Sequence, residues 1–247
     1  MAEQEHSLER PDLNRAAQEA WDQNAACWDG RFGEGNDFQL VLIGPAAERL
    51  LQVQPGEAVL DVACGTAMLS RELALAVGPG GQVVGVDFCA PMLAVGRRNL
   101  ARWGLEDVVS LVEGDAQRLP FADGAFAGAV SGFALRNVPD IKRVLAEMGR
   151  VVRPGGRVVT LEFAKPRAPV FKELYNFYFD RVVPLVGRLV SGADGPYRYL
   201  PRSLKAFPHQ REIAGMFAAV GLADVRYFEL MGATVAVHVG TVAEKLD

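Results

Sequence analysis

The chain has 247 residues and a formal net charge of −4, with 50% apolar and 23% charged residues. This balance excludes a mostly disordered protein, and the charge provides no basic footprint for nucleic acid. The charged N-terminus is unlike a signal peptide, and the longest uncharged stretch is far shorter than the ~20 residues of a membrane span. Three cysteines without CxxC spacing favour a reducing compartment, so we expect a cytoplasmic protein.

The predicted elements begin with residues 1–50, whose polar, helical pattern indicates an N-terminal helical cap on a main domain of residues 51–247. Three Pro-Gly turns then precede short runs of β-branched or apolar residues, at 55–61, 79–87 and 154–161. Proline cannot continue a helix and glycine supplies a positive φ. Each turn is therefore predicted to end a helix and to start a strand.

Two further strands are predicted at 108–112 and 126–130, and helical spacing of apolar residues predicts helices over 141–148 and 213–220. Apolar strands that alternate with helices indicate a parallel sheet covered on both faces. After residue 222, two short runs flank Met231-Gly232 and predict an antiparallel hairpin. The sequence thus predicts a doubly wound, Rossmann-like α/β fold with a mostly parallel seven-stranded sheet that ends in this hairpin.

Residues 165–208 form a long insertion before the last helix. Eight aromatic residues lie in it: Phe171, Tyr175, Phe177, Tyr178, Phe179, Tyr197, Tyr199 and Phe207. A connection of this length is more often a lid or a binding element than a bare loop. We expect it to cover a substrate, although an amphipathic helix packed on the sheet would give the same pattern.

The first strand leads into the turn Asp61 to Met68, the usual ligand site of an open α/β sheet. A dinucleotide fingerprint would place glycines at 63, 65 and 68, whereas the chain has Ala63, Gly65 and Met68. An adenosyl ligand without phosphates needs only a tight turn at Gly65 and an acidic Asp61 for its cationic group. An ordinary strand-to-helix turn is the alternative interpretation.

Two more carboxylates follow strands of the predicted sheet. Asp87 ends the second strand, where a carboxylate can accept both ribose hydroxyls, and Asp115 follows the third, where it can accept from an adenine amino group. Either residue alone could be a solvated loop aspartate. Together with Asp61 they indicate an adenosine-type ligand, and they favour S-adenosylmethionine over NAD.

Other chemistry has little support in the sequence. No His, Cys or Glu set has metal-ligand spacing, so no metal site is predicted, and neither a GxSxG nor a Walker A motif is present. His209 is expected to cap a helix. His238 is more often a packed strand histidine than a base in this kind of pattern.

Three stretches carry a resemblance to a known family: residues 64–67 (CGTA), 133–140 (FALRNVPD) and 150–163 (RVVRPGG to LEF). They are similar to the glycine turn and signature segments of the ubiquinone/menaquinone biosynthesis C-methyltransferases, a family of S-adenosylmethionine-dependent methyltransferases. The resemblance covers roughly residues 50–241. The chain departs from it at Ala127 and Ala164, and in an N-terminal motif that lies in the predicted cap.

This resemblance implies a methyltransferase fold that binds S-adenosylmethionine. The residues expected at the cofactor are Asp61, Gly65, Thr66, Asp87, Phe88, Asp115 and Ala116. Transfer to a ring carbon requires an ionised hydroxyl beside it, so the expected acceptor is a reduced, prenylated quinol. Arg136 is the first candidate to hold its oxygen, and an ion pair at a helix start is the equal alternative; Tyr178 and His238 are weaker candidates.

The implied partners follow from that acceptor. A lipid quinol would have to be collected from a membrane, so peripheral contact with its inner face is expected, and a homodimer is left open. Two other functions remain as alternatives: methylation of a smaller phenolic or polyketide acceptor, and a non-catalytic module that binds an adenosyl ligand.

Overall fold

The computed structural model describes residues 44–166, 203, 204 and 206–244. Most of the predicted cap (1–50) and of the predicted insertion (165–208), including Tyr178, lies outside these residues. Within them, no helix is long and apolar enough to cross a membrane.

The described residues form one seven-stranded sheet with the order β3-β2-β1-β4-β5-β7-β6. The strands are β1 (Ala58–Val62), β2 (Gln82–Asp87), β3 (Val109–Glu113), β4 (Phe126–Gly132), β5 (Val152–Phe163), β6 (Leu222–Leu230) and β7 (Val235–Val242). Neighbours among β1 to β5 pair in parallel, whereas β7 is antiparallel to both β5 and β6. The predicted mostly parallel sheet with a C-terminal antiparallel hairpin is confirmed.

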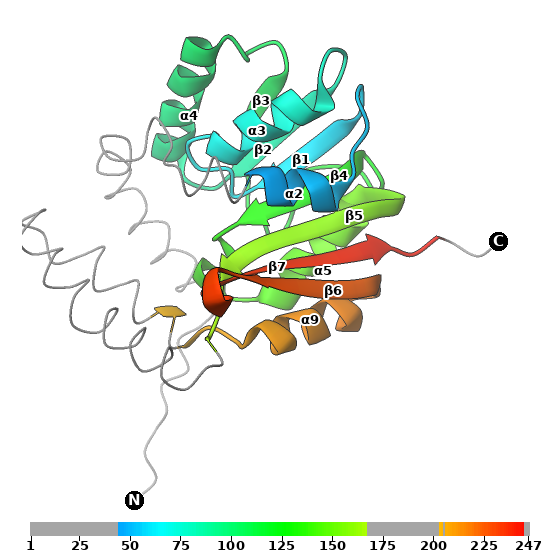
Figure 1. Cartoon of the computed structure of the whole chain (residues 1–247). Coiled ribbons are helices and arrows are strands. Elements are labelled where there is room, and N and C mark those ends of the chain that lie inside the picture. The colour runs from blue at the N-terminus through cyan, green and yellow to red at the C-terminus, as the bar shows by residue number, and fades with distance from the viewer. Residues whose placement is uncertain (1–43, 167–202, 205, 245–247) are drawn as a thin grey trace, which may run out of the picture.

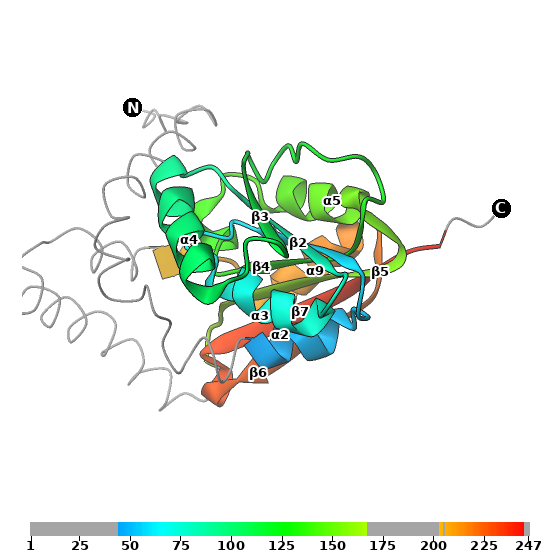
Figure 2. The same cartoon turned by 90° about the horizontal axis from the view of Figure 1, so that it is seen from above.

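Helices cover both faces of the sheet, as expected for a doubly wound fold (Figures 1 and 2). One face carries α2 (Gly44–Leu51), α3 (Met68–Val77) and α4 (Ala90–Trp103), and the other carries α5 (Ile141–Val151) and α9 (Gln210–Ala219). Because side chains alternate along a strand, each face has its own apolar core. Leu60 and Val62 of β1 pack toward α5 and α9, whereas Val59 packs toward α2 and α3.

The third Pro-Gly turn differs from its prediction. β5 begins at Val152, before Pro154-Gly155-Gly156, and its pairing with β4 shifts between Phe126↔Val152 and Gly128↔Arg157. The turn residues therefore form a bulge inside the strand. A Cβ on Gly156 would lie 2.4 Å from the carbonyl oxygen of Ala127, so only glycine fits this close approach.

Helix α9 begins and ends as the sequence predicts. His209 is its N-cap, and its side chain accepts a hydrogen bond from the N–H of Arg211. The Glu212 carboxylate in turn accepts a hydrogen bond from the N–H of His209. This arrangement is a capping box. Gly221 follows the last turn with a φ of +89°, which suits the residue after a helix.

Arg150, in the last turn of α5, holds the loop that leads into β4. Its guanidinium donates to both Glu147 oxygens at 2.9 and 2.8 Å, to Asp123 at 2.7 Å, and to the carbonyl oxygens of Phe121 and Leu119. Glu147 also accepts from the Leu119 N–H at 2.9 Å. The Arg150 hydrogen bonds to Glu147 lower the pKa of that carboxyl. This planar fork explains the first arginine of the RVVRPGG segment as a structural residue.

Candidate functional site

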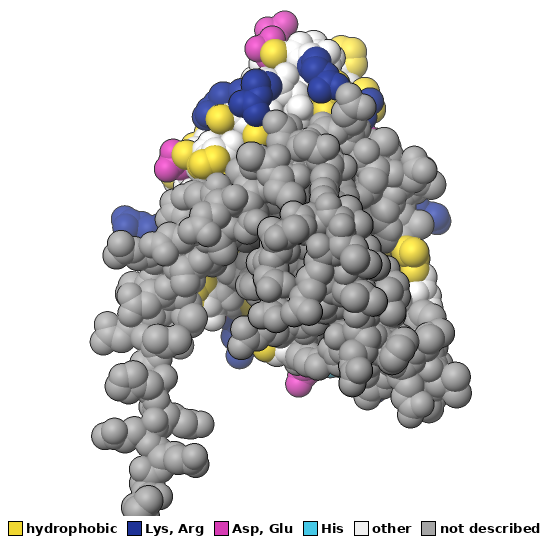
Figure 3. Space-filling view, turned by 90° about the vertical axis from the view of Figure 1, so that its left-hand side faces the viewer, with side chains coloured by type: hydrophobic (Ala, Val, Ile, Leu, Met, Phe, Trp, Pro, Cys, Tyr) yellow, Lys and Arg dark blue, Asp and Glu magenta, His cyan; other side chains and the backbone are white. Residues whose placement is uncertain are grey.

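The order of the strands has its switch point between β1 and β4. The chain proceeds from β1 through β2 to β3 on one side and from β4 to β5 on the other, and such a switch point opens a crevice at the carboxyl ends of the strands. These ends point away from the arrowhead of β7, to the left in Figure 1. Figure 3 views the molecule from this side, and the Lys and Arg side chains that it shows gather at the upper end of the described surface.

The loop after β1 is a tight turn built from left-handed residues. Ala63, Gly65 and Ala67 have φ values of 59°, 54° and 66°. The Ala67 N–H donates to the Cys64 carbonyl at 2.9 Å, and the loop continues directly into α3. The sequence predicts the turn at Gly65. It does not reveal that the two alanines share the left-handed conformation.

Helix α4 supports this loop from the other side. The side-chain amide of Asn99 donates to the Thr66 carbonyl at 3.1 Å. A Cβ on Gly96 would lie 3.3 Å from the Gly65 carbonyl oxygen and 2.8 Å from Leu111, so a glycine lets the helix approach the loop. Gly96 and Asn99 were missed by sequence reasoning, because contact between α4 and the β1 loop depends on the packing of the sheet.

Asp87 joins the ends of β1 and β2. One carboxylate oxygen accepts from the Gly65 N–H at 2.8 Å, and the other accepts from the Cys89 N–H at 2.9 Å. The side chain is buried. Asp87 thus has a structural role in the turn in addition to the ligand role that the sequence predicts for it.

Asp61 is fully buried behind the same turn. Its carboxylate accepts from the Ser70 hydroxyl at 2.6 Å, and it is 1% exposed. Burial raises the pKa of Asp61 to about 7; the Ser70 bond acts against this rise and the charge of Asp87 adds to it. A positive charge at this edge would favour the ionised carboxylate, so the two aspartates provide an electrostatic preference for a cationic ligand.

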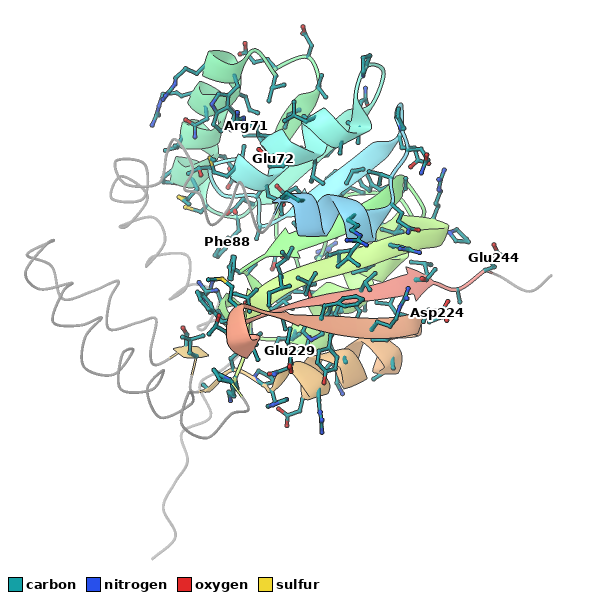
Figure 4. All side chains as sticks on the ribbon, viewed as in Figure 1. Arg71, Glu72, Phe88, Asp224, Glu229 and Glu244 are labelled. Atoms are coloured by element: carbon teal, nitrogen blue, oxygen red, sulfur yellow. The ribbon has the colours of Figure 1, made fainter. Side chains whose placement is uncertain are left out.

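The remaining predicted cofactor residues lie at the same edge. Phe88 follows β2 and packs with Cys89 and Met92 in a small apolar cluster, and Figure 4 shows it at the carboxyl end of the strands. Asp115 is exposed after β3, where it accepts from the Gln117 N–H at 2.8 Å. Ala116 lies beside it and is partly buried. The fold therefore brings together the ends of three strands, as the sequence predicts.

A second group of residues follows β4. Phe133 has a φ of 58°, an uncommon value for a large side chain, and its carbonyl accepts from Arg136 at 2.8 Å and from Asn137 at 3.3 Å. Both donors belong to the 3-10 helix η2 (Leu135–Asn137). The guanidinium carbon of Arg136 lies 5.1 Å from the ring centre of Phe163 and 5.8 Å from that of Phe133. Arg136 thus lies against this pair of aromatic rings, whose centres are 4.9 Å apart.

Glu162 is the acidic partner of Arg136. The Oε2 atom of this β5 residue lies 3.6 Å from the Arg136 Nη1, and Oε1 accepts from the Leu135 N–H at 2.6 Å. Burial raises the pKa of Glu162 to about 7, while Arg136 acts to lower it. Sequence reasoning used Glu162 only as part of a family signature. It is the one carboxylate in β5 and follows the mostly apolar run 158–161, which is the signal that could have identified it.

The three candidates for acceptor chemistry have different positions. Arg136 lies at the carboxyl edge, and its contact with Glu162 agrees with the ion-pair alternative as well as with a role at the edge. His238 lies within β7, 1% exposed, and is stacked between Phe217 and Tyr227 with Nε2 2.8 Å from the Gln210 carbonyl oxygen. This is the environment of a packed strand histidine, away from the cofactor edge. Tyr178 lies outside the described residues.

The chemistry of the edge suits a cationic adenosyl ligand better than a metal ion. Among residues 44–166 and 203–244 as described, no group of three His, Cys, Asp or Glu side chains is arranged to hold a metal. The edge instead offers two buried aspartates and a partly buried phenylalanine beside a glycine turn. Carboxylates, apolar contact and close backbone approach are the features that a sulfonium-bearing nucleoside requires.

Comparisons with known proteins agree with this geometry. A sequence model of the ubiE/COQ5 methyltransferase family matches residues 45–242. The demethylmenaquinone methyltransferase of Desulfitobacterium hafniense is 45% identical over 194 residues, which cover 78% of this chain and 77% of the relative. The protein of the same name from Bacillus subtilis is 41% identical over 192 residues, covering 78% of this chain and 82% of the relative.

Solved structures share the fold. An S-adenosylmethionine-dependent methyltransferase from Aquifex aeolicus superposes with a TM-score of 0.65 at 15% identity, covering 90% of this chain and 98% of that one. A phosphoethanolamine N-methyltransferase from Haemonchus contortus, solved in complex with S-adenosyl-L-methionine, also gives a TM-score of 0.65 at 15% identity, covering 95% and 60%. At these identities the likeness establishes the fold alone.

Proposed function

The chain belongs to the ubiE/COQ5 methyltransferase family, and we propose that it methylates a ring carbon of a reduced quinone precursor, a demethylmenaquinol. It is an S-adenosylmethionine-dependent methyltransferase. The acceptor is supported by relatives that carry the name demethylmenaquinone methyltransferase at 41–46% identity. In the structure, the observation that carries the proposal is an arginine that lies against two contacting aromatic rings beside the adenosyl edge.

We assign the cofactor contacts to the loops at the ends of β1, β2 and β3. S-adenosylmethionine supplies a methyl group on a positively charged sulfur. Gly65 and Thr66 provide backbone groups of the turn, and Asp87 provides a carboxylate for the ribose hydroxyls. Phe88 packs against the base, and the pair Asp115-Ala116 lies at its amino edge. Asp61 contributes negative charge from behind the turn.

Arg136 is proposed to bind the acceptor oxygen. A ring carbon is a poor nucleophile until the neighbouring hydroxyl loses its proton, and a fixed guanidinium stabilises the oxyanion that results. Phe133 and Phe163 hold the guanidinium and offer apolar surface to a flat ring. The residues of the site therefore align the ring with the methyl group, and alignment can contribute about 7–11 kcal/mol to lowering the barrier.

The prenyl tail requires an apolar surface outside this edge. We propose that the aromatic insertion at 165–208 and the N-terminal segment cover the tail, and that the protein makes peripheral contact with the inner face of the membrane from the cytoplasm. Co-sedimentation with vesicles that contain a long-tailed demethylmenaquinone, compared with vesicles without it, tests this contact. Loss of co-sedimentation after removal of residues 165–208, with S-adenosylmethionine binding retained, would support the role of the insertion.

The activity is tested by methyl transfer from labelled S-adenosylmethionine to a short-tailed demethylmenaquinone, with and without a reductant. We expect a product heavier by one methyl group only under reduction, because the quinone has no hydroxyl to ionise. Arg136→Ala should lose turnover and keep S-adenosylmethionine binding. Arg157→Ala is the matched control, since Arg157 also donates to a backbone carbonyl, that of Leu50, but lies six residues before the carboxyl end of β5.

Two results would contradict the proposal. Absence of product under both conditions, in a protein that binds S-adenosylmethionine, would show that the acceptor is of another class, such as a smaller phenol or polyketide. A protein that binds S-adenosylmethionine and methylates no member of either class would be a sensor of the adenosyl ligand.

A further inference from the structure

The unpartnered polar atoms of the described residues gather in one place. Five buried side-chain atoms in this part of the chain have no hydrogen-bond partner: Ser131 Oγ, Arg136 Nε, Thr160 Oγ1, Glu162 Oε2 and His238 Nδ1. Scattered orphan atoms would have no common cause, whereas a cluster of them points to one feature, since buried polar groups in proteins are nearly always paired.

Strand pairing places three of these residues in one row. Ser131 of β4 pairs with Thr160 of β5, and Thr160 pairs with His238 of β7. Residues directly opposite each other in a sheet point to the same face, with Cβ atoms about 4.5–5.5 Å apart in antiparallel pairs. His238 stacks on Phe217 of α9, so the row lies on the face covered by α5 and α9.

The other two atoms adjoin this row at the carboxyl edge. Glu162 is two residues beyond Thr160 on β5 and therefore points to the same face. Its Oε2 is the oxygen that lies 3.6 Å from Arg136, too far for a hydrogen bond. A continuous line of polar groups thus runs from Arg136 at the candidate acceptor site to His238 inside the sheet.

The row has a direction. Nε2 of His238 faces the Gln210 carbonyl oxygen at 2.8 Å, and because a carbonyl can only accept, Nε2 carries the hydrogen. Nδ1 is then an acceptor, and burial keeps the ring neutral by lowering the pKa of His238 to about 4. The two hydroxyls can both donate and accept. Internal water between them would link a protonated Glu162 to the lone pair of His238.

We propose that Glu162 takes up the proton that the quinol hydroxyl loses, and that Ser131, Thr160 and His238 hold internal water that hydrogen-bonds to Glu162 while it carries this proton. The inference rests on the proposed function. The O–H bond of the quinol breaks and its electron pair stays on oxygen, while the proton passes to a Glu162 oxygen. The ring carbon then forms its bond to the methyl group as the methyl–sulfur bond breaks with its electrons on sulfur, which leaves a ketone at the former hydroxyl. The ring hydrogen then leaves as a proton, its electron pair restores the aromatic ring, and Glu162 returns its proton to the oxygen, so that one net proton is released.

The charges around Glu162 fit this exchange. Arg136 of η2 is the cation next to Glu162, and the neutral His238 of β7 pairs with Thr160, two residues earlier on β5. Glu229 of β6 lies two strands away, opposite the β7 residue that pairs with Glu162, and it accepts a hydrogen bond from Gln210 at 2.8 Å. Lys165 follows the end of β5. Burial raises the pKa of Glu162 to about 7, which suits a group that gains and loses a proton near neutral pH.

The first test is Glu162→Gln, which keeps an oxygen for the Leu135 N–H and cannot take up a proton. We expect kcat to fall about 100-fold or more, with the acceptor KM and the S-adenosylmethionine affinity unchanged. The acid limb of the wild-type kcat profile near pH 7 should disappear. Glu147→Gln is the matched control, because Glu147 is also buried, also accepts a backbone N–H and also pairs with an arginine; it should keep the limb.

A second measurement does not depend on turnover. The carboxyl infrared band of the protein should show one group titrating near pH 7 that Glu162→Gln removes. Thr160→Val, which removes one hydroxyl of the row, should move that titration to higher pH, since the charged carboxylate loses a polar neighbour. Thr160→Val should also lower kcat, but by a smaller factor than Glu162→Gln does.

The outcomes separate this inference from the proposed function. A Glu162→Gln variant with wild-type turnover, or with its acid limb intact, would overturn the inference. An infrared titration that Thr160→Val leaves unmoved would overturn the coupling between Glu162 and the row. If the wild type fails to methylate the quinol, the proposed acceptor is wrong, and the infrared series still decides whether Glu162 exchanges a proton with this row.

Discussion

The backbone N–H of Gly65 donates to Oδ2 of Asp87 at 2.8 Å and so fixes the turn after β1 to the end of β2. The two residues are 22 positions apart in the chain and meet because β1 and β2 are parallel neighbours. The Asp87 side chain therefore shapes the turn that is proposed to bind the adenosyl ligand. The site depends on this link as much as on any direct contact.

Gly65→Ala is expected to weaken S-adenosylmethionine binding about 10-fold or more, which corresponds to ~1.4 kcal/mol. Gly65 has a φ of 54°, where alanine is strained, and an added Cβ would also press on the Met92 side chain at 3.3 Å, so we expect the bond from the Gly65 N–H to Asp87 to weaken. Isothermal titration calorimetry measures the change.

Gly104→Ala is the control for this substitution. Gly104 has a similar φ of +66° and nothing within 4 Å of an added Cβ. Both variants should lose about 1 kcal/mol of stability, because alanine is strained in the left-handed region. Equal affinities for S-adenosylmethionine in the two variants would show that the turn does not shape the site.

Asp61→Asn is expected to stabilise the protein at pH 8 and to have a smaller effect near pH 4. The folded state raises the pKa of Asp61 from 3.8 to about 7, so between these values it binds a proton that the unfolded chain has lost. Wild-type stability therefore falls as the pH rises through this window, by at least about 1 kcal/mol. Urea unfolding at pH 4, 6 and 8 measures the difference.

Ser70→Ala provides an internal check. The hydrogen bond from the Ser70 hydroxyl lowers the pKa of Asp61, so its removal should raise that pKa further. The fall in the free energy of unfolding with rising pH should then continue to a higher pH than in the wild type. A pH dependence that is identical in the wild type and Asp61→Asn would assign the effect to other groups.

How far the sequence predicts this molecule depends on the range of the interactions. Strands such as β1 and β2 were located to within one residue, because Pro-Gly turns and β-branched runs are local signals. The start of β5 was wrong, since its bulge is set by pairing with β4. Asp87 was placed at the correct edge, but its bond to Gly65 follows from the register of two strands.

Longer-range packing explains what the sequence missed at the site. Glu162 and Arg136 are 26 positions apart and meet only because β4 and β5 are adjacent. The environment of His238 comes from α9 and β6, which no periodicity in β7 reveals. Sequence patterns thus predict the carboxyl edge of the sheet and its acidic residues, whereas the fold adds the neighbouring groups that determine their protonation.

Binding of S-adenosylmethionine is expected to release protons from the protein at pH 7. The ligand carries positive charge to an edge where Asp61 is partly protonated, and the ionised carboxylate is favoured near a cation. Calorimetry in two buffers of different ionisation enthalpy counts the protons released. The Asp61→Asn variant should release fewer protons than the wild type when it binds S-adenosylmethionine. The wild type should also release fewer protons when it binds the product S-adenosylhomocysteine, whose sulfur is uncharged. Equal release in all three cases would exclude Asp61 as the linked group.

Arg150→Lys is expected to lower the free energy of unfolding by about 1–3 kcal/mol, because an ammonium cannot reproduce the fork that reaches Glu147, Asp123 and two loop carbonyls. Arg153→Lys is the matched control: Arg153 is 55% exposed and pairs only with Glu57 among the described residues, so its effect should stay within about 0.5 kcal/mol. Urea unfolding compares the two variants. Since Arg150 lies away from the adenosyl edge, S-adenosylmethionine affinity should be unchanged in both variants. An Arg150→Lys variant as stable as the wild type would mean that the loop before β4 is held by apolar contacts, such as that between the rings of Phe121 and Phe126, rather than by Arg150.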